Sequence, residues 1–266
     1  PSEVLRVRVS VYRSVGTTGY WTGGASFSGT TEYFHVATDT NPWRLAAPAW
    51  PVETTYIVHS VADDKAQPTP NSEVPGPSNS FLFDITPPVS LTTVPANGAR
   101  VNALTVLTGT SFDANGVNFV QVSIKDAQEA KWWNGSTFTS VSEVWQNATA
   151  INPWTLTMPA TAWQSGREYQ VRSRATDNAT KIELAPVTVT FLFDNTVPTT
   201  LVTKPVTGTI YSAMPTLSGT SNDPVPATGT KKSESQRVEL NIRSLAGSGS
   251  YWNGSGYVAG STWVVS

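Results

Sequence analysis

The chain has 266 residues, 39% of them hydrophobic and 10% aromatic, so it can bury sizeable cores in one large domain or in two to three small ones. Its formal net charge is −2 and only 14% of its residues are charged, which leaves no basic surface for nucleic acid. The lack of cysteine excludes disulfide bonds, and no apolar run approaches the roughly 20 residues of a membrane-spanning helix.

The first part of the chain opens with a strand pattern and continues through aromatic motifs. Residues 7–11, VRVSV, alternate apolar and polar side chains, which is typical of a half-buried strand. The motifs that follow are YWTGG at 20–24, NPW at 41–43, WPVETTY at 50–56 and FLFDITPP at 81–88. Turn residues separate these motifs, so this part is expected to consist of short strands and turns.

The middle of the chain carries seven short runs rich in Val, Thr, Ile and aromatic residues. Alternation is clear at Val120, Val122 and Ile124, and no run shows the apolar stripe of an amphipathic helix. About seven strands in one repeat predict a two-sheet Greek-key sandwich of the immunoglobulin-like kind. The seven runs are residues 90–95, 103–112, 117–125, 136–142, 154–159, 167–177 and 186–194.

These segments belong to a repeat. The phrase FLFD at 81–84 returns 110 residues later at 191–194, and LTGTSFD at 107–113 returns at the same spacing as LSGTSND at 217–223. The strand motif VRVSV has further copies in VQVSI and VELNI, so three copies are present. A repeat of this length is the size of a small domain and is too long for a solenoid unit.

The repeat predicts an all-β chain of tandem immunoglobulin-like sandwiches, with domains at residues 1–84, 85–194 and 195–266. Each joint is FD followed by a proline-containing segment, and proline fixes φ and keeps the residue before it extended. We therefore expect the domains to stand end to end. The first copy is expected to lack its opening two strands and the third its closing strands, which predicts either a longer polypeptide or completion by another chain.

Two tyrosines mark the start of an alternating strand. WPVETTY and WQSGREY each place a tryptophan six residues before the tyrosine, at Trp50 and Tyr56 and at Trp163 and Tyr169. This spacing resembles the tyrosine corner of fibronectin type III and related sandwiches, in which the phenol forms a hydrogen bond back to the loop.

The combined pattern of FD-x-T-x-P, L-[ST]-G-T-S-x-D, V-x-V-x-I, [YW]-W-N-G-S and A-T-D-N resembles the bacterial immunoglobulin-like repeats of large cell-surface and adhesin proteins. The resemblance covers essentially the whole chain, although the tryptophan motif is unusual for that family. It implies a non-enzymatic extracellular or cell-surface stalk or scaffold. Neighbouring repeats or further copies of the chain would be its partners, without nucleic acid and without a membrane span.

Aspartates gather at the predicted joints. Asp84 ends one copy, and the loops that carry Asp113 and Asp177 lie at the end of the sandwich where the chain enters. Three converging carboxylates repel one another unless they bind a hard cation such as calcium. Asp194 and Asp223 repeat two of these positions in the third copy. The alternative is that these aspartates only cap turns.

Tryptophans offer a second candidate site. The hairpin motifs at Trp21, Trp133 and Trp252 would display flat rings to a cell-surface polysaccharide if those rings are exposed, which makes a carbohydrate-binding or adhesive module the alternative function. Core packing is the competing interpretation for the hairpins. It is the favoured one for four other tryptophans, Trp43, Trp50, Trp154 and Trp163.

Four asparagines stand in Asn-x-Ser/Thr sequons and are candidate glycosylation sites: Asn134, Asn147, Asn178 and Asn253. Because Asn-Gly is a favoured hairpin turn, the sequons at Asn134 and Asn253 have a purely structural explanation as well.

No catalytic constellation stands out in the sequence. His35 and His59 have no histidine counterpart in the middle copy, and no phosphate-binding loop or closely paired catalytic carboxylates are recognisable. The sequence therefore favours a non-enzymatic structural protein that forms a stalk, filament or surface layer.

Overall fold

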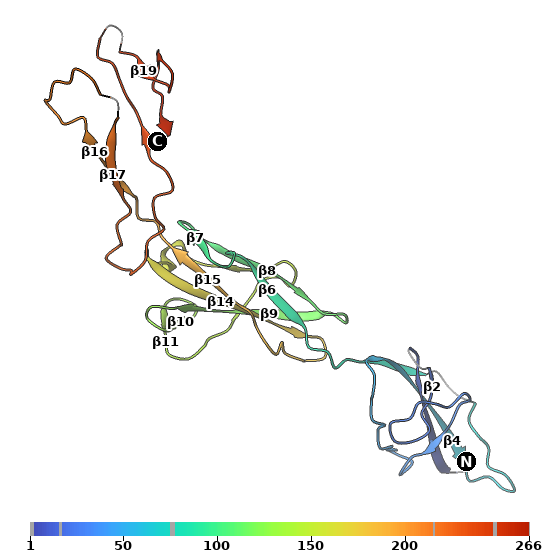
Figure 1. Ribbon diagram of the computed structural model, residues 1–266. Coiled ribbons are helices and arrows are strands. Elements are labelled where there is room, and N and C mark those ends of the chain that lie inside the picture. The colour runs from blue at the N-terminus through green and yellow to red at the C-terminus, as the bar shows by residue number, and fades with distance from the viewer. Residues whose placement is uncertain (1–2, 16–17, 75–77, 215, 247–248, 266) are drawn as a thin grey trace. The chain divides into compact units, whose positions relative to one another are not determined.

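The computed structural model describes residues 3–15, 18–74, 78–214, 216–246 and 249–265, and it is an all-β structure (Figure 1). Among these residues the only helical element is a short 3-10 turn, Ala160–Ala162, and no helix is long and apolar enough to cross a membrane. The predicted all-β fold class is confirmed.

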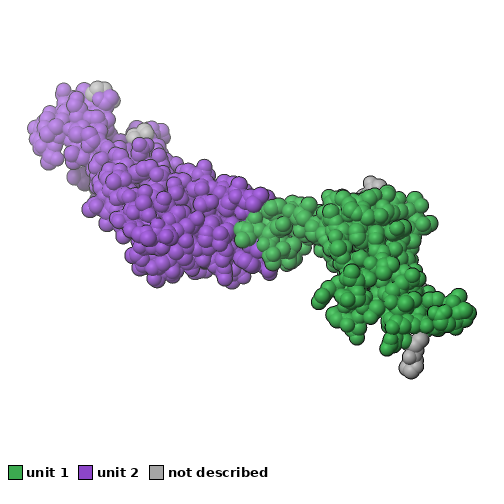
Figure 2. Space-filling view, turned by 90° about the horizontal axis from the view of Figure 1, so that it is seen from below, with its two compact units in different colours: residues 1–88, 113–116, 177–182 green, residues 89–112, 117–176, 183–266 purple. Residues whose placement is uncertain are grey.

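The chain separates into two compact units (Figure 2). The first contains Pro1–Pro88 together with two short loops, Asp113–Gly116 and Asp177–Ile182. The second contains all the remaining residues, that is Val89–Phe112, Val117–Thr176 and Glu183–Ser266. The loops that carry Asp113 and Asp177 thus belong to the same unit as Asp84.

The first unit is built on one antiparallel sheet with the strand order β2-β1-β4-β5, and β3 also pairs with β1. Alternation in β1 sends Val7, Val9 and Val11 to the buried side. The strands are β1 Val4–Arg13, β2 Gly19–Tyr20, β3 His35–Val36, β4 Thr54–Asp64 and β5 Asn79–Phe83.

The middle repeat is a sandwich of two sheets. One sheet has the order β13-β8-β6, and the other has the order β11-β10-β9-β14-β15-β7, with β12 pairing to β9. β7 runs parallel to β15, whereas the pairs β6–β8, β8–β13 and β14–β15 are antiparallel. The bounds are β6 Val89–Val94, β7 Ala99–Val101, β8 Val106–Phe112, β9 Val117–Asp126, β10 Lys131–Trp133, β11 Phe138–Ser140, β12 Gln146–Asn147, β13 Trp154–Thr157, β14 Arg167–Asp177 and β15 Thr188–Phe193.

A single core joins the two sheets of this sandwich. Leu107 of β8 and Trp154 of β13 belong to the same buried cluster as Val122 of β9, Val171 of β14 and Phe191 of β15. All seven predicted strand segments of the middle repeat contain strands, so the predicted immunoglobulin-like sandwich is confirmed. The short strands β7, β10 and β12 were not predicted, because two or three residues carry no measurable alternation.

The third repeat starts with the same hairpin as the middle one. In β6–β8, Leu91 pairs with Thr110, and in β16–β17 Leu201 pairs with Thr220, with a register shift at the same place in both hairpins. The strands of this repeat are β16 Thr199–Lys204, β17 Ser218–Asn222, β18 Glu239–Leu240, β19 Tyr251–Trp252, β20 Tyr257–Val258 and β21 Val264–Val265.

Both tyrosine corners are confirmed. The Tyr56 hydroxyl donates to the Val52 carbonyl at 2.9 Å, and the Tyr169 hydroxyl accepts from the Gln164 amide at 2.8 Å. Each phenol ring packs against its tryptophan, with ring centroids 4.7 Å apart for Trp50 and 4.9 Å apart for Trp163. The phenylalanines of FLFD complete each aromatic cluster, which explains why that phrase recurs with the tyrosine corner.

The tryptophans predicted to fill the cores do so with one exception. Trp154 is fully buried and covers Gly109, where an added Cβ would lie 2.3 Å from the indole. Trp163 is buried, and Trp50 packs against its core while half-buried. For Trp43 the core prediction is wrong, because the residue is 39% exposed. The described strands of the first unit form one sheet, so Trp43 has no second sheet to pack against.

Candidate metal centre

Three carboxylates converge in the first unit. Asp84 directly follows β5, Asp113 directly follows β8 and Asp177 is the last residue of β14. One oxygen from each lies within 4.8 Å of the others. The convergence expected from the sequence is therefore confirmed, and we call these three residues the first carboxylate cluster.

Each aspartate of the cluster uses one oxygen to fold its own loop. In all three the Oδ1 atom accepts a hydrogen bond from a backbone N–H two to four residues further along the chain, which is the turn role that asparagine and aspartate often take. The donors are Thr86 at 3.1 Å to Asp84, Asn115 at 2.7 Å to Asp113 and Lys181 at 2.8 Å to Asp177.

The second oxygens of two of these carboxylates have no partner. Asp84 is 8% exposed and Asp177 is fully buried, and the Oδ2 atom of each is buried without a hydrogen bond. A buried anionic oxygen that lacks a donor is costly, on the order of 1–3 kcal/mol or more. Turn formation explains the Oδ1 atoms of the cluster but does not explain the Oδ2 atoms.

The electrostatics of Asp84 point in the same direction. Burial raises the pKa of the Asp84 carboxyl, and the negative charges of Glu53 and Asp113 raise it further. Hydrogen bonds from the Thr86 amide and from the Asn115 side chain lower this pKa without cancelling the rise. A cation would reverse the balance, because it attracts all three carboxylates and supplies the partner that the Oδ2 atoms lack.

Hydrogen bonds around the cluster hold its loops together. Glu53 accepts from the Asn115 side-chain amide at 2.6 Å and from the Thr86 hydroxyl, and the hydrogen bond from Thr86 is the main cause that lowers the pKa of Glu53. Asn178 joins the two loops, because its side-chain amide donates to the Asn115 carbonyl and its backbone N–H to the Gly116 carbonyl, both at 3.1 Å. The loops that carry the three carboxylates are thus held together by their own hydrogen bonds.

Sequence reasoning missed Glu53 and Asn115 as partners of the cluster. Glu53 aligns with Gly166 in the middle repeat, so the comparison of repeats drew no attention to it. Thr86 could have been found, because FDITP returns as FDNTVP with Thr196 at the same place. Its hydroxyl and amide are what that threonine contributes to the joint.

Asp194 and Asp223, the remaining metal candidates, lie in the second unit. Both are buried, at 5% and 3% exposure. Within the described part of the chain they belong to no group of three or more potential metal-ligating side chains. Most of their oxygens are occupied by hydrogen-bond donors.

The three hairpin tryptophans differ in exposure. Trp21 and Trp133 are buried, at 7% and 4% exposure, and Trp252 is half-buried. The Trp133 ring packs on Phe138, with ring centroids 5.1 Å apart, and it belongs to the core of the middle repeat. Because sugar stacking requires an exposed ring face, Trp21 and Trp133 are placed as core residues.

The sequon asparagines take part in local hydrogen bonds. Asn134 accepts from the Ser136 amide at 2.9 Å, and Asn253 accepts from the Ser255 amide at 3.0 Å. The glycine that follows each asparagine has a positive φ, 103° and 102°, as a tight hairpin turn requires. Asn147 accepts from Gln121 on β9, and Asn178 joins the loops of the first carboxylate cluster. Glycosylation of all four stays a prediction.

Comparison with known proteins gives a likeness to solved structures. No protein-family model matches the chain, and no curated protein matches it by sequence. Among solved structures it is similar to the fibronectin(III)-like modules of CbhA from Clostridium thermocellum, with 15% sequence identity and a TM-score of 0.33 over 73% of this chain and 80% of that chain. A likeness this weak carries no argument, and the β-sandwich of the middle repeat rests on its own strands.

Proposed function

We propose that the chain serves as part of a non-enzymatic extracellular structural protein, in which tandem immunoglobulin-like repeats form a stalk, filament or surface layer. Support comes from the repeat itself. The strand pairs β6–β8 and β16–β17 have the same register. Each of the two tyrosine corners has its own tryptophan and its own FLFD phenylalanines at equivalent positions. A chain that reuses one module in this way is suited to spanning distance.

Calcium is the ion we propose for the first carboxylate cluster. Calcium takes six to eight oxygen ligands in flexible geometry, and carboxylates from three separate segments can supply several of them. The observation that carries this proposal is the pair of buried, unpartnered Oδ2 atoms on Asp84 and Asp177. A bound ion would fasten the segment after β5 to the loops 113–116 and 177–182.

An extracellular location is consistent with such a site. Calcium sites in extracellular modules typically bind with dissociation constants of about 10⁻⁴ to 10⁻³ M, a range suited to the calcium concentration outside cells. A site of three carboxylates on separate loops would work in that range. The carbohydrate-binding alternative is not proposed, because Trp21 and Trp133 are core residues.

The test is calcium binding by the whole chain and by two matched variants. Asp113→Asn removes a charge from the first cluster, and Asp223→Asn makes the same change at the equivalent position of the next repeat. Calcium at 100-fold its dissociation constant should stabilise the wild type by about 2.7 kcal/mol. Calorimetric titration and thermal unfolding should show this effect in Asp223→Asn and should lose it in Asp113→Asn.

Two results would contradict the proposed function. If thermal unfolding of the wild type responds neither to calcium nor to chelator, the first cluster does not bind calcium. Small-angle scattering of the same samples tests the array, because end-to-end repeats should scatter as an extended particle. A compact, folded-back particle in the presence of calcium would contradict a stalk.

A further inference from the structure

The second carboxylate pair, Asp194 and Asp223, stands where the repeat places Asp84 and Asp113. Asp194 directly follows β15 and Asp223 directly follows β17. In the third copy an insertion, residues 224–235, comes after Asp223. We call this insertion the latch segment.

The latch segment presents two consecutive backbone amides to the carboxylate pair. The Ser233 N–H donates to Asp194 Oδ2 at 2.7 Å, and the Glu234 N–H donates to Asp223 Oδ2 at 2.6 Å. The Ser233 hydroxyl is a third donor to the pair and lies 3.2 Å from Asp223 Oδ2. Glu234 has a φ of 71°, a left-handed conformation that is uncommon outside glycine. Successive N–H groups around such a residue can form a concave nest that binds anions.

The remaining oxygen of Asp194 is satisfied as well. Its Oδ1 atom accepts from the Ser165 hydroxyl at 2.9 Å and from the Thr196 amide at 3.0 Å. Burial by itself would raise the pKa of Asp194, but the hydrogen bonds from Thr196, Ser233 and Ser165 lower it overall. Three of the four oxygens of the pair therefore have donors, and Asp223 Oδ1 is the exception.

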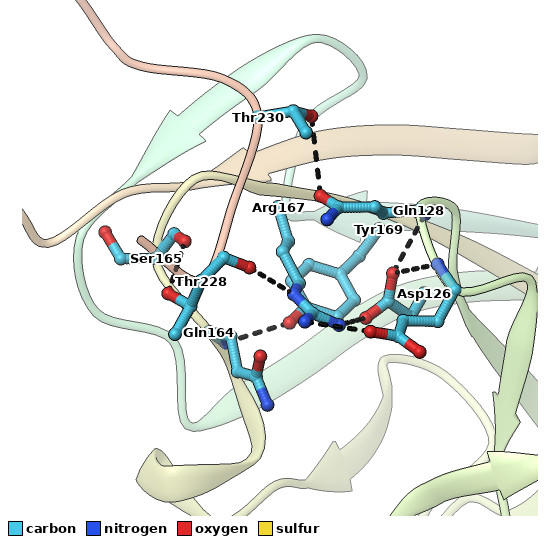
Figure 3. Close-up of polar contacts among 9 residues, drawn as sticks. Asp126, Gln128, Gln164, Ser165, Arg167, Tyr169, Thr228 and Thr230 are labelled. Atoms are coloured by element: carbon cyan, nitrogen blue, oxygen red, sulfur yellow. Dashed lines mark hydrogen bonds and ion pairs between the residues drawn. The ribbon is translucent and has the colours of Figure 1, made fainter. Parts of the chain in front are cut away.

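The rest of the latch segment is anchored to the middle repeat around Arg167 (Figure 3). Arg167 Nε donates to the Thr228 carbonyl at 2.7 Å. Its other nitrogens form ion pairs with Asp126 at 2.7 Å and with Glu129 at 3.0 Å. These two acidic residues of the middle repeat hold the guanidinium in place. Lys231 pairs with Glu168 at 2.6 Å. The latch segment thus contacts the start of β14 and, through Thr230, Gln128 in the turn after β9.

Close backbone contact between two glycines makes this docking possible. The amides of Thr230 and Lys231 donate to the Gly166 carbonyl at 3.0 Å and 3.1 Å. A Cβ added at Gly229 would lie 2.3 Å from the Gly166 carbonyl carbon and oxygen. Any side chain at position 229 would therefore push the latch segment away.

We propose that the latch segment takes the place of a cation at the second carboxylate pair, and that it fastens the third repeat to the middle repeat without metal. Two N–H donors already point at the oxygens that a cation would bind, and their partial positive charges repel a cation. The chain itself supplies both sides of this contact, because residues 224–235 bind to the end of the middle repeat.

The test measures amide exchange and calcium binding in the full chain. By NMR, the amides of Ser233 and Glu234 should exchange slowly and at the same rate with calcium or with chelator. Gly229→Ala should speed their exchange at least tenfold, while Gly256→Ala, where a new Cβ meets nothing within 4 Å, should leave it unchanged. Asp223→Asn should keep every calcium-binding step of the wild type.

Faster exchange of the Ser233 and Glu234 amides in chelator, or loss of a calcium-binding step in Asp223→Asn, would overturn the proposal. Unchanged exchange in Gly229→Ala would overturn it too. The outcome does not depend on calcium at the first cluster. If calcium binds nowhere, the calcium site proposed above fails, whereas slow exchange in the wild type and fast exchange in Gly229→Ala still support the latch.

Discussion

The first carboxylate cluster and the second carboxylate pair derive from the same repeated motifs but have different surroundings. At the cluster, three carboxylates face one another and two oxygens lack donors. At the pair, the latch segment directs two backbone amides into the equivalent place. Acidic side chains buried at equivalent places of two repeats therefore have different partners in one chain.

The difference shows what an insertion in a surface loop can do. In the middle repeat the loop after β8 is short and contributes Asp113 and Asn115. In the third repeat the corresponding loop is longer, and it reaches back to the middle repeat. Because loop length is tolerated at small entropic cost, an insertion can bring peptide donors to buried carboxylates without altering the sandwich.

The largest expected effect comes from Arg167. Arg167→Ala removes the partner of Asp126, whose side chain is 3% exposed, and it also removes the donor to Thr228. Loss of one member of a buried ion pair should lower the free energy of unfolding by about 3 kcal/mol. Denaturant unfolding of the whole chain measures the change.

Two variants sharpen the Arg167 prediction. Arg167→Lys keeps the charge but loses the forked geometry that reaches Asp126, Glu129 and Thr228 together, so it should recover only part of the stability. Glu53→Ala is the comparison at the first cluster. Glu53 is half-buried and accepts hydrogen bonds from the side chains of Thr86 and Asn115, so we expect a loss of about 1 kcal/mol or less. Equal losses in Arg167→Ala and Glu53→Ala would contradict the contrast between the two regions.

Acid should affect the two regions in opposite directions. The pKa of Asp84 is raised in the folded chain, so without calcium its ionised form destabilises the fold at neutral pH. This loss is recovered as the pH falls through the raised pKa towards about 4, the unfolded value. The pKa of Asp194 is lowered, so its contribution is present above about 4 and is lost as the pH falls through the folded value.

Thermal unfolding in chelator checks the signs of these pH effects. At pH 7, Asp84→Asn should be more stable than the wild type, because the substitution removes a buried charge without a partner. Asp194→Asn should be less stable, because its hydrogen bonds to backbone donors lose their ionic character. The same sign for both variants would mean that the second carboxylate pair is as poorly satisfied as the first cluster.

Much of this architecture was predictable because it depends on local patterns. Alternation at Val120, Val122 and Ile124 identified a strand with one buried face, and all three residues are fully buried or nearly so. The convergence of Asp113 and Asp177 was predictable from topology, because the loops after the second and sixth strands of a Greek-key sandwich lie at the same end.

The errors and omissions concern contacts between segments. The core prediction fails at Trp43 although it holds at the aligned Trp154, because residues that align need not share a covering sheet. In the sequence, residues 224–235 are recognisable only as an insertion relative to the middle repeat, and surface loops commonly tolerate insertions. Nothing in its sequence indicates that Thr228 and Ser233 contact the middle repeat, because such contacts depend on the surface that faces the loop.

The smallest expected effect is at Glu234. Substitutions there distinguish the contribution of the backbone of the latch segment from the contribution of its side chains. Glu234→Gly keeps the backbone amide that donates to Asp223. It removes the cost of the left-handed backbone, which is about 1 kcal/mol for a residue with a Cβ. Against this, glycine loses somewhat more conformational entropy on folding. The free energy of unfolding, and the opening free energy obtained from amide exchange, should therefore each change by less than about 1 kcal/mol. Glu234→Val, which is disfavoured at positive φ, should open the latch segment and speed exchange at Ser233. If glycine opens the latch as readily as valine does, the contact depends on the glutamate side chain, which lies 3.9 Å from Arg100, and the backbone amides are not its basis.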